Sequence, residues 1–163
     1  MSDHIEVATL GLLLGRLERL NESVVAAVCA EHGVSPAEVR VLAMLRHGSA
    51  QSGVRPTEIS RWVVQTTGGL TATLRRLEAD GRISREDDPD DGRGRLVVLT
   101  EAGAAFYDLV FDQLSEAYGE ILAVVDVETS TEAVRRLIEC FEHAAGRPTT
   151  RQWDLTELRM VEI

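Results

Sequence analysis

The chain has 163 residues, 44% of them hydrophobic, which suffices for one sizeable core but not for two independent domains. No apolar run approaches the roughly 20 residues of a membrane-spanning helix, and no basic segment precedes the first apolar stretch, so we expect a cytoplasmic protein without a membrane partner. The net charge of −10 argues against a protein that binds nucleic acid over its whole surface.

The cysteines and histidines show no metal-binding pattern. Cys29 and Cys140 lie far apart in a chain without a CxxC motif, which argues against a disulfide framework and against a zinc module. The four histidines are equally scattered, so we expect neither a metal site nor a cofactor. A lone cysteine on an apolar helix face is more often a small buried hydrophobe than a redox sensor.

Two helices are predicted in the N-terminal third. Apolar residues recur at three- and four-residue spacing from Ile5 to Ala30, which indicates one face of a long helix. The segment 35–38, Ser-Pro-Ala-Glu, opens a second helix, because serine can cap it, proline suits its first turn and glutamate completes a capping box. This second helix is expected to end near Arg46.

A helix-turn-helix is predicted next. The segment 55–58, Arg-Pro-Thr-Glu, suits the first turn of a short helix that runs through Trp62. A further helix is expected from about Thr66 to Asp80, with Gly81 at its end. Its buried stripe is expected to consist of Leu70, Leu74 and Leu77. Two short helices separated by a tight turn are typical of a helix-turn-helix.

A β-hairpin and two more helices follow. Residues 82–85 and 95–100 are predicted to be strands on either side of the loop DDPDDGRG, whose proline, aspartates and glycines can turn the chain back. A long helix is expected from Thr100 onward, and a last one from roughly Thr131 to Ala145. The tail 147–163 includes Trp153 and is too apolar for a solvated tail, but the sequence assigns it no role.

The order of these elements defines the expected fold class. It is mainly α with a small β-hairpin wing: a winged helix-turn-helix over about 35–100, between dimerisation helices at about 5–31 and 101–146, in one domain. The terminal helices carry more apolar surface than the small central part can cover. We therefore expect them to pack against a second copy in a homodimer.

The charges are unevenly distributed. From Arg55 to Arg95 the arginines and the acidic residues balance, so this segment is neutral and the rest of the chain carries the whole net charge of −10. All 17 basic residues are arginine, whose planar guanidinium suits phosphates and guanine edges, although codon bias in a GC-rich genome explains the missing lysines better. The acidity therefore does not exclude DNA binding by the central segment.

Two sequence blocks resemble a known family. TTGGLTATLRRLEADGRISR (66–85), followed by DPDDGRGRLVVLTEAG (88–103), resembles the recognition helix and wing of the MarR family of winged helix-turn-helix transcriptional regulators. The similar order of elements extends over roughly 10–145. The resemblance implies a homodimer that binds a pseudo-palindromic operator in double-stranded DNA. It also implies repression as the default mode and release by a small aromatic or anionic effector.

The resemblance implies a set of DNA contacts. Arg93 corresponds to the wing-tip arginine that reaches into the minor groove, and Asp91 is expected to orient the wing by pairing with Arg76. The exposed face of the recognition helix is expected to carry Thr67, Thr71 and Arg75. Phosphate contacts are expected from Arg55, Thr66, Thr67 and Gly68. Thr73 and Arg75 depart from the family's usual residues, which leaves the operator sequence open.

An effector site is the least marked feature of the sequence. Many relatives bind their effectors between the dimerisation helices and the DNA-binding lobe. Residues with suitable chemistry are Arg16, Arg19, His47, Tyr107 and Phe111. No spacing singles them out, because the two arginines can equally form surface ion pairs and Phe111 can belong to the core.

Three other functions are alternatives to a DNA-binding regulator that is released by an effector. An enzyme would need a nucleophile with its base, a paired-carboxylate cleft or a phosphate loop, and the sequence shows none of these patterns. A winged-helix module that binds proteins would suit the net acidity and the tryptophan-containing tail, but it gains little from Arg75 and Arg93. In a third reading, a regulator switched by Cys29 or Cys140 would lose DNA binding on oxidation.

Overall fold

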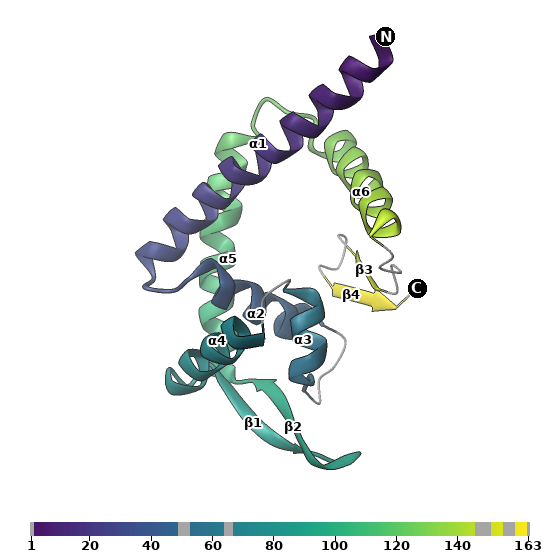
Figure 1. The fold of residues 1–163 in the computed structure, drawn as a ribbon. Coiled ribbons are helices and arrows are strands. Elements are labelled where there is room, and N and C mark those ends of the chain that lie inside the picture. Colours follow the sequence, from purple (N-terminus) through teal and green to yellow (C-terminus); the bar gives the residue numbers. More distant parts are fainter. Residues whose placement is uncertain (1, 49–52, 64–66, 146–150, 155–158, 163) are drawn as a thin grey trace.

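The computed structural model describes residues 2–48, 53–63, 67–145, 151–154 and 159–162. Figure 1 shows a lobe of helices and a hairpin at one end of the long helix α5, with α1 crossing α5 and α6 running back toward the lobe at a distance from α5. The elements in chain order are α1 (Ser2–Glu31), α2 (Pro36–His47), α3 (Pro56–Trp62), α4 (Thr67–Ala79), β1 (Ile83–Asp88), β2 (Asp91–Leu99), α5 (Glu101–Ile121), α6 (Val127–Ala144), β3 (Arg151–Asp154) and β4 (Arg159–Glu162).

Helix α2 lies at the centre of the lobe. It contacts α1, α3, α4, α5 and β2, and its Val41 and Leu42 are completely buried. The fully buried side chains from the surrounding elements are Cys29, Ile59, Leu77, Val97 and Val110. One core therefore joins the helix-turn-helix, the wing and the long helices.

The predicted capping signals are found where the sequence placed them. The Ser35 hydroxyl accepts a hydrogen bond from the backbone N–H of Glu38, and the Glu38 carboxylate accepts one from the backbone N–H of Ser35, which is the reciprocal pattern of a capping box. Helix α4 ends at Ala79, and Gly81 just after it has a φ of +69°, a left-handed conformation that glycine adopts without a steric penalty.

The buried stripe of α4 is confirmed and is wider than predicted. Leu70, Leu74 and Leu77 are all buried, and Thr73 is buried with them. The Thr73 hydroxyl donates to the carbonyl oxygen of Gly69 at 3.0 Å, which satisfies its polar group inside the core. Thr73 therefore faces the protein interior and does not belong to the exposed face of the helix.

The wing is longer than the sequence indicated. Strands β1 and β2 are antiparallel, and their pairing extends to Asp87 opposite Arg95 and Asp88 opposite Asp91, so most of the predicted loop DDPDDGRG belongs to the strands. Aspartate and glycine disfavour strands, but Arg95 donates to Asp87 across the hairpin at 2.8 Å, and opposite charges on facing positions stabilise a strand pair. Val54 adds a single antiparallel bridge to Val97.

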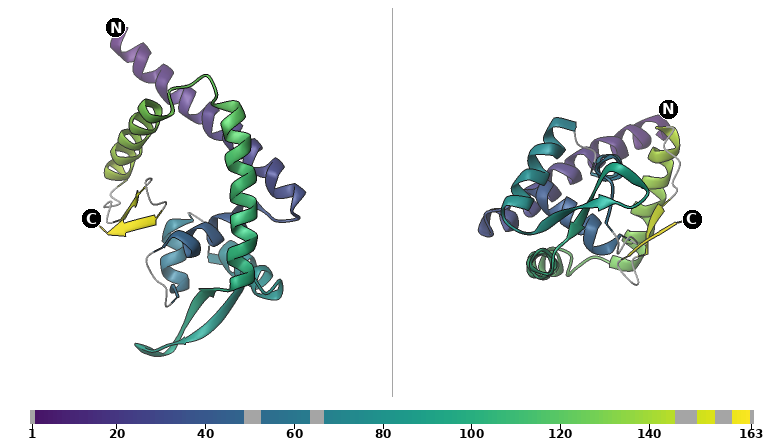
Figure 2. Two further views of the ribbon diagram at one scale, coloured as in Figure 1. Left: turned by 180° about the vertical axis from the view of Figure 1, so that it is seen from behind. Right: turned by 90° about the horizontal axis from the view of Figure 1, so that it is seen from below.

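The long helices leave much apolar surface uncovered. The accessible surface is 11158 Å², whereas a compact monomer of this mass exposes about 8,000 Å². Large apolar side chains that are exposed lie on all three long helices, among them Leu10, Leu13, Leu17, Leu20, Leu109, Ile121, Val134, Ile138 and Phe141. Figure 2 shows how far α1 and α6 extend from the lobe.

Two features at the C-terminal end differ from expectation. Helix α6 begins at Val127, earlier than the predicted Thr131, because the Asp126 carboxylate accepts a hydrogen bond from the backbone N–H of Thr129 and caps the helix. The tail contains an antiparallel hairpin, in which Trp153 of β3 lies opposite Met160 of β4.

Among the described residues, no helix is both long enough and apolar enough to span a membrane.

Candidate nucleic-acid interface

Helix α4, the expected recognition helix, presents a small, open face to solvent. Its buried stripe packs against the lobe, and Gly68, Thr71, Ala72 and Arg75 are exposed. A Cβ added at Gly68 would meet no atom within 4 Å, so packing within the chain does not require glycine there. Thr66 lies outside the described residues, and Thr67 is the first residue of the helix.

The ion pairs of the central segment distinguish Arg75 from its neighbouring arginines. Five arginines between residues 55 and 95 are paired with carboxylates, namely Arg55, Arg76, Arg82, Arg85 and Arg95. Within the described side chains of this segment, Arg75 is the arginine that forms neither an ion pair nor a hydrogen bond. Its positive charge is therefore not neutralised by the protein, and such a charge on an exposed helix face is suited to a phosphate or a guanine edge.

Arg55 joins the first helix of the helix-turn-helix to the wing. Its Nε donates to Oδ2 of Asp88 at 2.6 Å, and the Asp88 side chain is only 2% exposed while that of Arg55 is 49% exposed. The hydrogen bond from Arg55, supported by the backbone N–H of Asp90, lowers the pKa of the Asp88 carboxyl. The phosphate contact expected of Arg55 stays a prediction.

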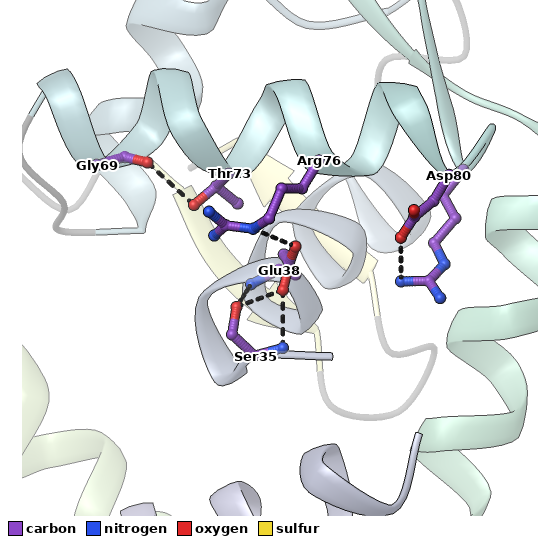
Figure 3. A network of polar contacts seen from close by, with 7 residues as sticks. Ser35, Glu38, Gly69, Thr73, Arg76 and Asp80 are labelled. Carbon is purple, nitrogen blue, oxygen red and sulfur yellow. Dashed lines mark hydrogen bonds and ion pairs between the residues drawn. The ribbon is translucent and has the colours of Figure 1, made fainter. Parts of the chain in front are cut away.

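The predicted pair between Asp91 and Arg76 is wrong. The Nε of Arg76 donates to Oε1 of Glu38 on α2 at 2.9 Å, as Figure 3 shows, and Asp91 lies at the far end of the hairpin, opposite Asp88. Arg76 points toward α2 because it follows the buried Thr73 along the same side of α4. The wing-orienting role of Asp91 and the minor-groove role of Arg93, which lies in β2 near the turn, stay predictions.

Glu38 therefore both caps α2 and pairs with α4, whereas the sequence analysis predicted only the cap. Burial by itself raises the pKa of its carboxyl, but hydrogen bonds from Ser35 and Arg76 outweigh this effect and lower the pKa below its usual value. The carboxylate is ionised at neutral pH although its side chain is only 7% exposed. Its partner lies 38 residues away in the sequence, and no local pattern links the two positions.

The predicted effector residues separate into two groups. His47, Tyr107 and Phe111 form one aromatic cluster: His47 Nε2 lies 3.1 Å from the Tyr107 hydroxyl, and the Phe111 ring centroid is 5.8 Å from that of Tyr107. Arg16 and Arg19 are exposed on α1. They precede Asn21, which contacts Tyr118, and Tyr118 is about 16 Å further along α5 than Tyr107. Within one chain, the arginines are not part of the cluster.

The tyrosine of this cluster gives a titration that can be measured. Burial, with a smaller contribution from Asp108, raises the pKa of Tyr107 to about 12, and burial also raises the pKa of Tyr118, the other of the chain's two tyrosines. We expect little phenolate absorbance from the folded protein at about pH 10, where free tyrosine is half ionised. The stabilisation by neutral Tyr107 is complete below pH 10 and is lost as the pH rises toward 12.

Two variants make the titration specific. Tyr107→Phe should remove the part of the absorbance change that occurs near pH 12, and Tyr118→Phe should leave that part in place. A folded wild-type protein whose tyrosines are already half ionised at about pH 10 would show that Tyr107 is not buried as described.

The two cysteines have different environments. Cys29 is completely buried in the core, and burial raises the pKa of its thiol, so little of the reactive thiolate is present at neutral pH. Cys140 is exposed on α6. Of the two candidate redox switches, the buried Cys29 is the less suited to oxidation.

Comparisons with known proteins identify the family. Residues 32–94, which contain α2, the helix-turn-helix and most of the wing, match the MarR family model. This segment of the chain belongs to the MarR family. It is 26% identical to the transcriptional activatory protein BadR of Rhodopseudomonas palustris, over 76% of this chain and 71% of that protein. It is also 26% identical to the multiple antibiotic resistance protein MarR of Escherichia coli, over 82% of this chain and 93% of that protein.

A solved structure shares the fold. That of CouR from Rhodococcus jostii RHA1, bound to p-coumaroyl-CoA, aligns with a TM-score of 0.71 at 20% identity and covers 81% of this chain and 90% of CouR. This MarR-family chain is thus a DNA-binding transcriptional regulator with the predicted winged-helix fold.

The Leu-Thr-x-x-Gly block after the wing, residues 99–103, has a direct structural explanation in this MarR-family chain. Thr100 caps α5 by accepting a hydrogen bond from the backbone N–H of Gly103, and its hydroxyl donates to the carbonyl oxygen of Gly81. A Cβ on Gly103 would lie 1.9 Å from the carbonyl oxygen of Arg82. The block therefore fixes where α5 leaves the end of α4 and the start of the wing.

Proposed function

We propose that this chain is a homodimeric repressor that binds a pseudo-palindromic operator and releases it when a small molecule binds. Each α4 enters a major groove with Arg75, and each wing places Arg93 in the flanking minor groove. A dimer with two-fold symmetry matches two half-sites about one helical turn apart. The observation that carries the proposal is the unneutralised Arg75 on the exposed face of α4, in a lobe whose other described arginines are paired.

The homodimer is supported by the uncovered apolar surface. The chain exposes about 3,000 Å² more than a compact monomer of its mass. The exposed stripe of α1, from Leu10 through Leu20, and the exposed Val134, Ile138 and Phe141 of α6 are apolar faces of the kind that a second copy buries.

Repression of transcription and release of the operator by an effector are the most specific parts of the proposal. Sequence similarity extends over more of the E. coli MarR chain than of the activator BadR, and the solved structure of a multiple antibiotic resistance repressor, MarR, is 26% identical to this chain. The effector is proposed to contact His47, Tyr107 and Phe111, which lie where α2 meets α5. The p-coumaroyl-CoA bound by CouR suggests aromatic acids and their thioesters as the first compounds to test.

Arginine substitutions test the DNA contacts. We expect Arg75→Ala to weaken binding to the operator by about 1 to 3 kcal/mol, or roughly 5- to 150-fold, if Arg75 reads a base. Arg93→Ala should also weaken binding, and both variants should stay dimeric. The measurement is a titration of labelled operator DNA at fixed salt, with sedimentation to establish the dimer.

Arg85→Ala is the matched control for these variants. It removes one positive charge from the same lobe, but that charge is already paired with Glu78 at 3.1 Å. If Arg75→Ala and Arg93→Ala both bound as tightly as Arg85→Ala, the proposed interface would be wrong.

A further inference from the structure

We infer that Glu38 is a positioning residue for DNA recognition, because it fixes the orientation of the recognition helix through Arg76. The inference rests on the proposed function, since the orientation of α4 matters only if α4 reads DNA. It concerns a carboxylate on α2, outside both helices of the helix-turn-helix.

The Glu38 carboxylate is held from two directions. Its Oε2 accepts hydrogen bonds from the backbone N–H of Ser35 at 2.8 Å and from the Ser35 hydroxyl at 2.5 Å. Its Oε1 accepts the bond from Nε of Arg76 at 2.9 Å. Both oxygens are thus occupied, one by the first turn of α2 and the other by α4 (Figure 3), so the carboxylate cannot follow a movement of Arg76 without breaking the cap of its own helix.

This pair supplies a directional constraint that the core does not. Leu70, Leu74 and Leu77 hold α4 by apolar contact, which is not directional and permits a helix to roll by small repacking steps. The hydrogen bond from Arg76 fixes one point on the α2 side of α4, directly beside Arg75 in the sequence. A roll of α4 that moved Arg75 would therefore have to stretch the Arg76–Glu38 pair.

Through α2, the Glu38–Arg76 pair also connects α4 to the helices that are proposed to form the dimer. Helix α2 contacts both α1 and α5, which carry the apolar faces proposed to form the dimer. The Glu38 carboxylate therefore links α4 to the part of the molecule that sets the distance between the two recognition helices. A dimer needs this distance to match the spacing of the half-sites, whereas non-specific contact with phosphates does not.

Four variants test the inference: Glu38→Gln, Arg76→Gln, the double variant, and Glu78→Gln as the matched control. Glutamine keeps the capping box but removes the charge that holds Arg76. Glu78 lies on α4 and pairs with Arg85 of β1, so it does not connect α4 to α2. Affinity is measured for operator DNA and for a random-sequence fragment of equal length, and folding is followed by thermal unfolding of the same samples.

The expected result has two parts. Glu38→Gln should lower operator affinity about tenfold, with little change in affinity for the random fragment, while Glu78→Gln stays near wild type. The double variant should bind no more weakly than Arg76→Gln alone, because Glu38 acts through Arg76. If Glu38 acted independently of Arg76, the two losses would multiply.

The outcomes separate the inference from the proposed function. Wild-type affinity in Glu38→Gln, or losses that multiply in the double variant, would overturn the inference and leave the proposed function standing. If Glu38→Gln does not fold, Arg76→Gln provides the test. This variant should fold, because the Arg76 side chain is 55% exposed and is not part of the capping box of α2. Arg76→Gln with unchanged operator affinity would overturn the inference. A folded wild-type dimer that binds no fragment specifically would overturn both proposals.

Discussion

Replacing Gly103 by alanine should destabilise the chain by about 3 kcal/mol. The added Cβ would lie 1.9 Å from the carbonyl oxygen of Arg82 and 2.8 Å from its carbonyl carbon. Both atoms belong to the backbone, so the contact cannot be relieved by turning a side chain. Either the start of α5 or the segment between α4 and β1 has to move, and such a movement strains the Thr100 bonds to Gly81 and Gly103.

The measurement is the free energy of unfolding in denaturant, at one protein concentration because a dimer's stability depends on concentration. Gly119→Ala is the matched control. Gly119 lies in the same helix, and a Cβ there would meet no atom within 4 Å, so this variant should gain about 0.5 to 1 kcal/mol from helix propensity. A Gly103→Ala variant as stable as wild type would show that the Arg82 carbonyl does not approach α5 as described.

Introducing a charge into the apolar faces of the long helices should abolish the dimer and, with it, most DNA binding. Leu17 of α1 is 56% exposed and Ile138 of α6 is 52% exposed, so neither side chain is needed for the core of a single chain. In a dimer interface, a glutamate at either position would be an unpaired buried charge. Leu17→Glu and Ile138→Glu should therefore stay folded but sediment as monomers.

The loss of DNA binding should be large because the two half-sites act together. Linking two binding modules raises affinity by roughly 10² to 10⁴ over either module alone, so a monomer should bind operator DNA at least about 100-fold more weakly. Arg75→Ala provides the contrast, since it should weaken DNA binding and leave the dimer intact. If both glutamate variants remained dimeric, the faces of α1 and α6 would not form the interface.

The sequence predicted those features that depend on neighbouring residues. The Ser35 cap, the stop of α4 just before Gly81 and the three-leucine stripe are local patterns, and the structure confirms each of them. Thr73 could have been recognised as buried, because it lies three positions after Leu70 and four before Leu77 on the same helix face. Because threonine is polar, the sequence analysis did not assign Thr73 to the buried stripe.

Features that depend on distant pairs were not predictable from one sequence. Arg55 with Asp88 and Arg76 with Glu38 are separated by 33 and 38 residues, and several other carboxylates offered equally plausible partners. The erroneous pairing of Arg76 with Asp91 came from this ambiguity. The strand ends were misplaced for a related reason, since the low strand propensity of the aspartates around the turn does not reveal the cross-strand contact of Asp87 with Arg95.

The most direct test of the central claim is binding of the purified wild-type protein to tiled DNA fragments from the region upstream of its own gene, with competitor DNA and at several salt concentrations. The account predicts saturable binding of one dimer to one pseudo-palindrome, with an affinity that falls steeply as salt rises. A folded dimer that binds neither these fragments nor any fragment of a genomic library above the level of competitor DNA would contradict it.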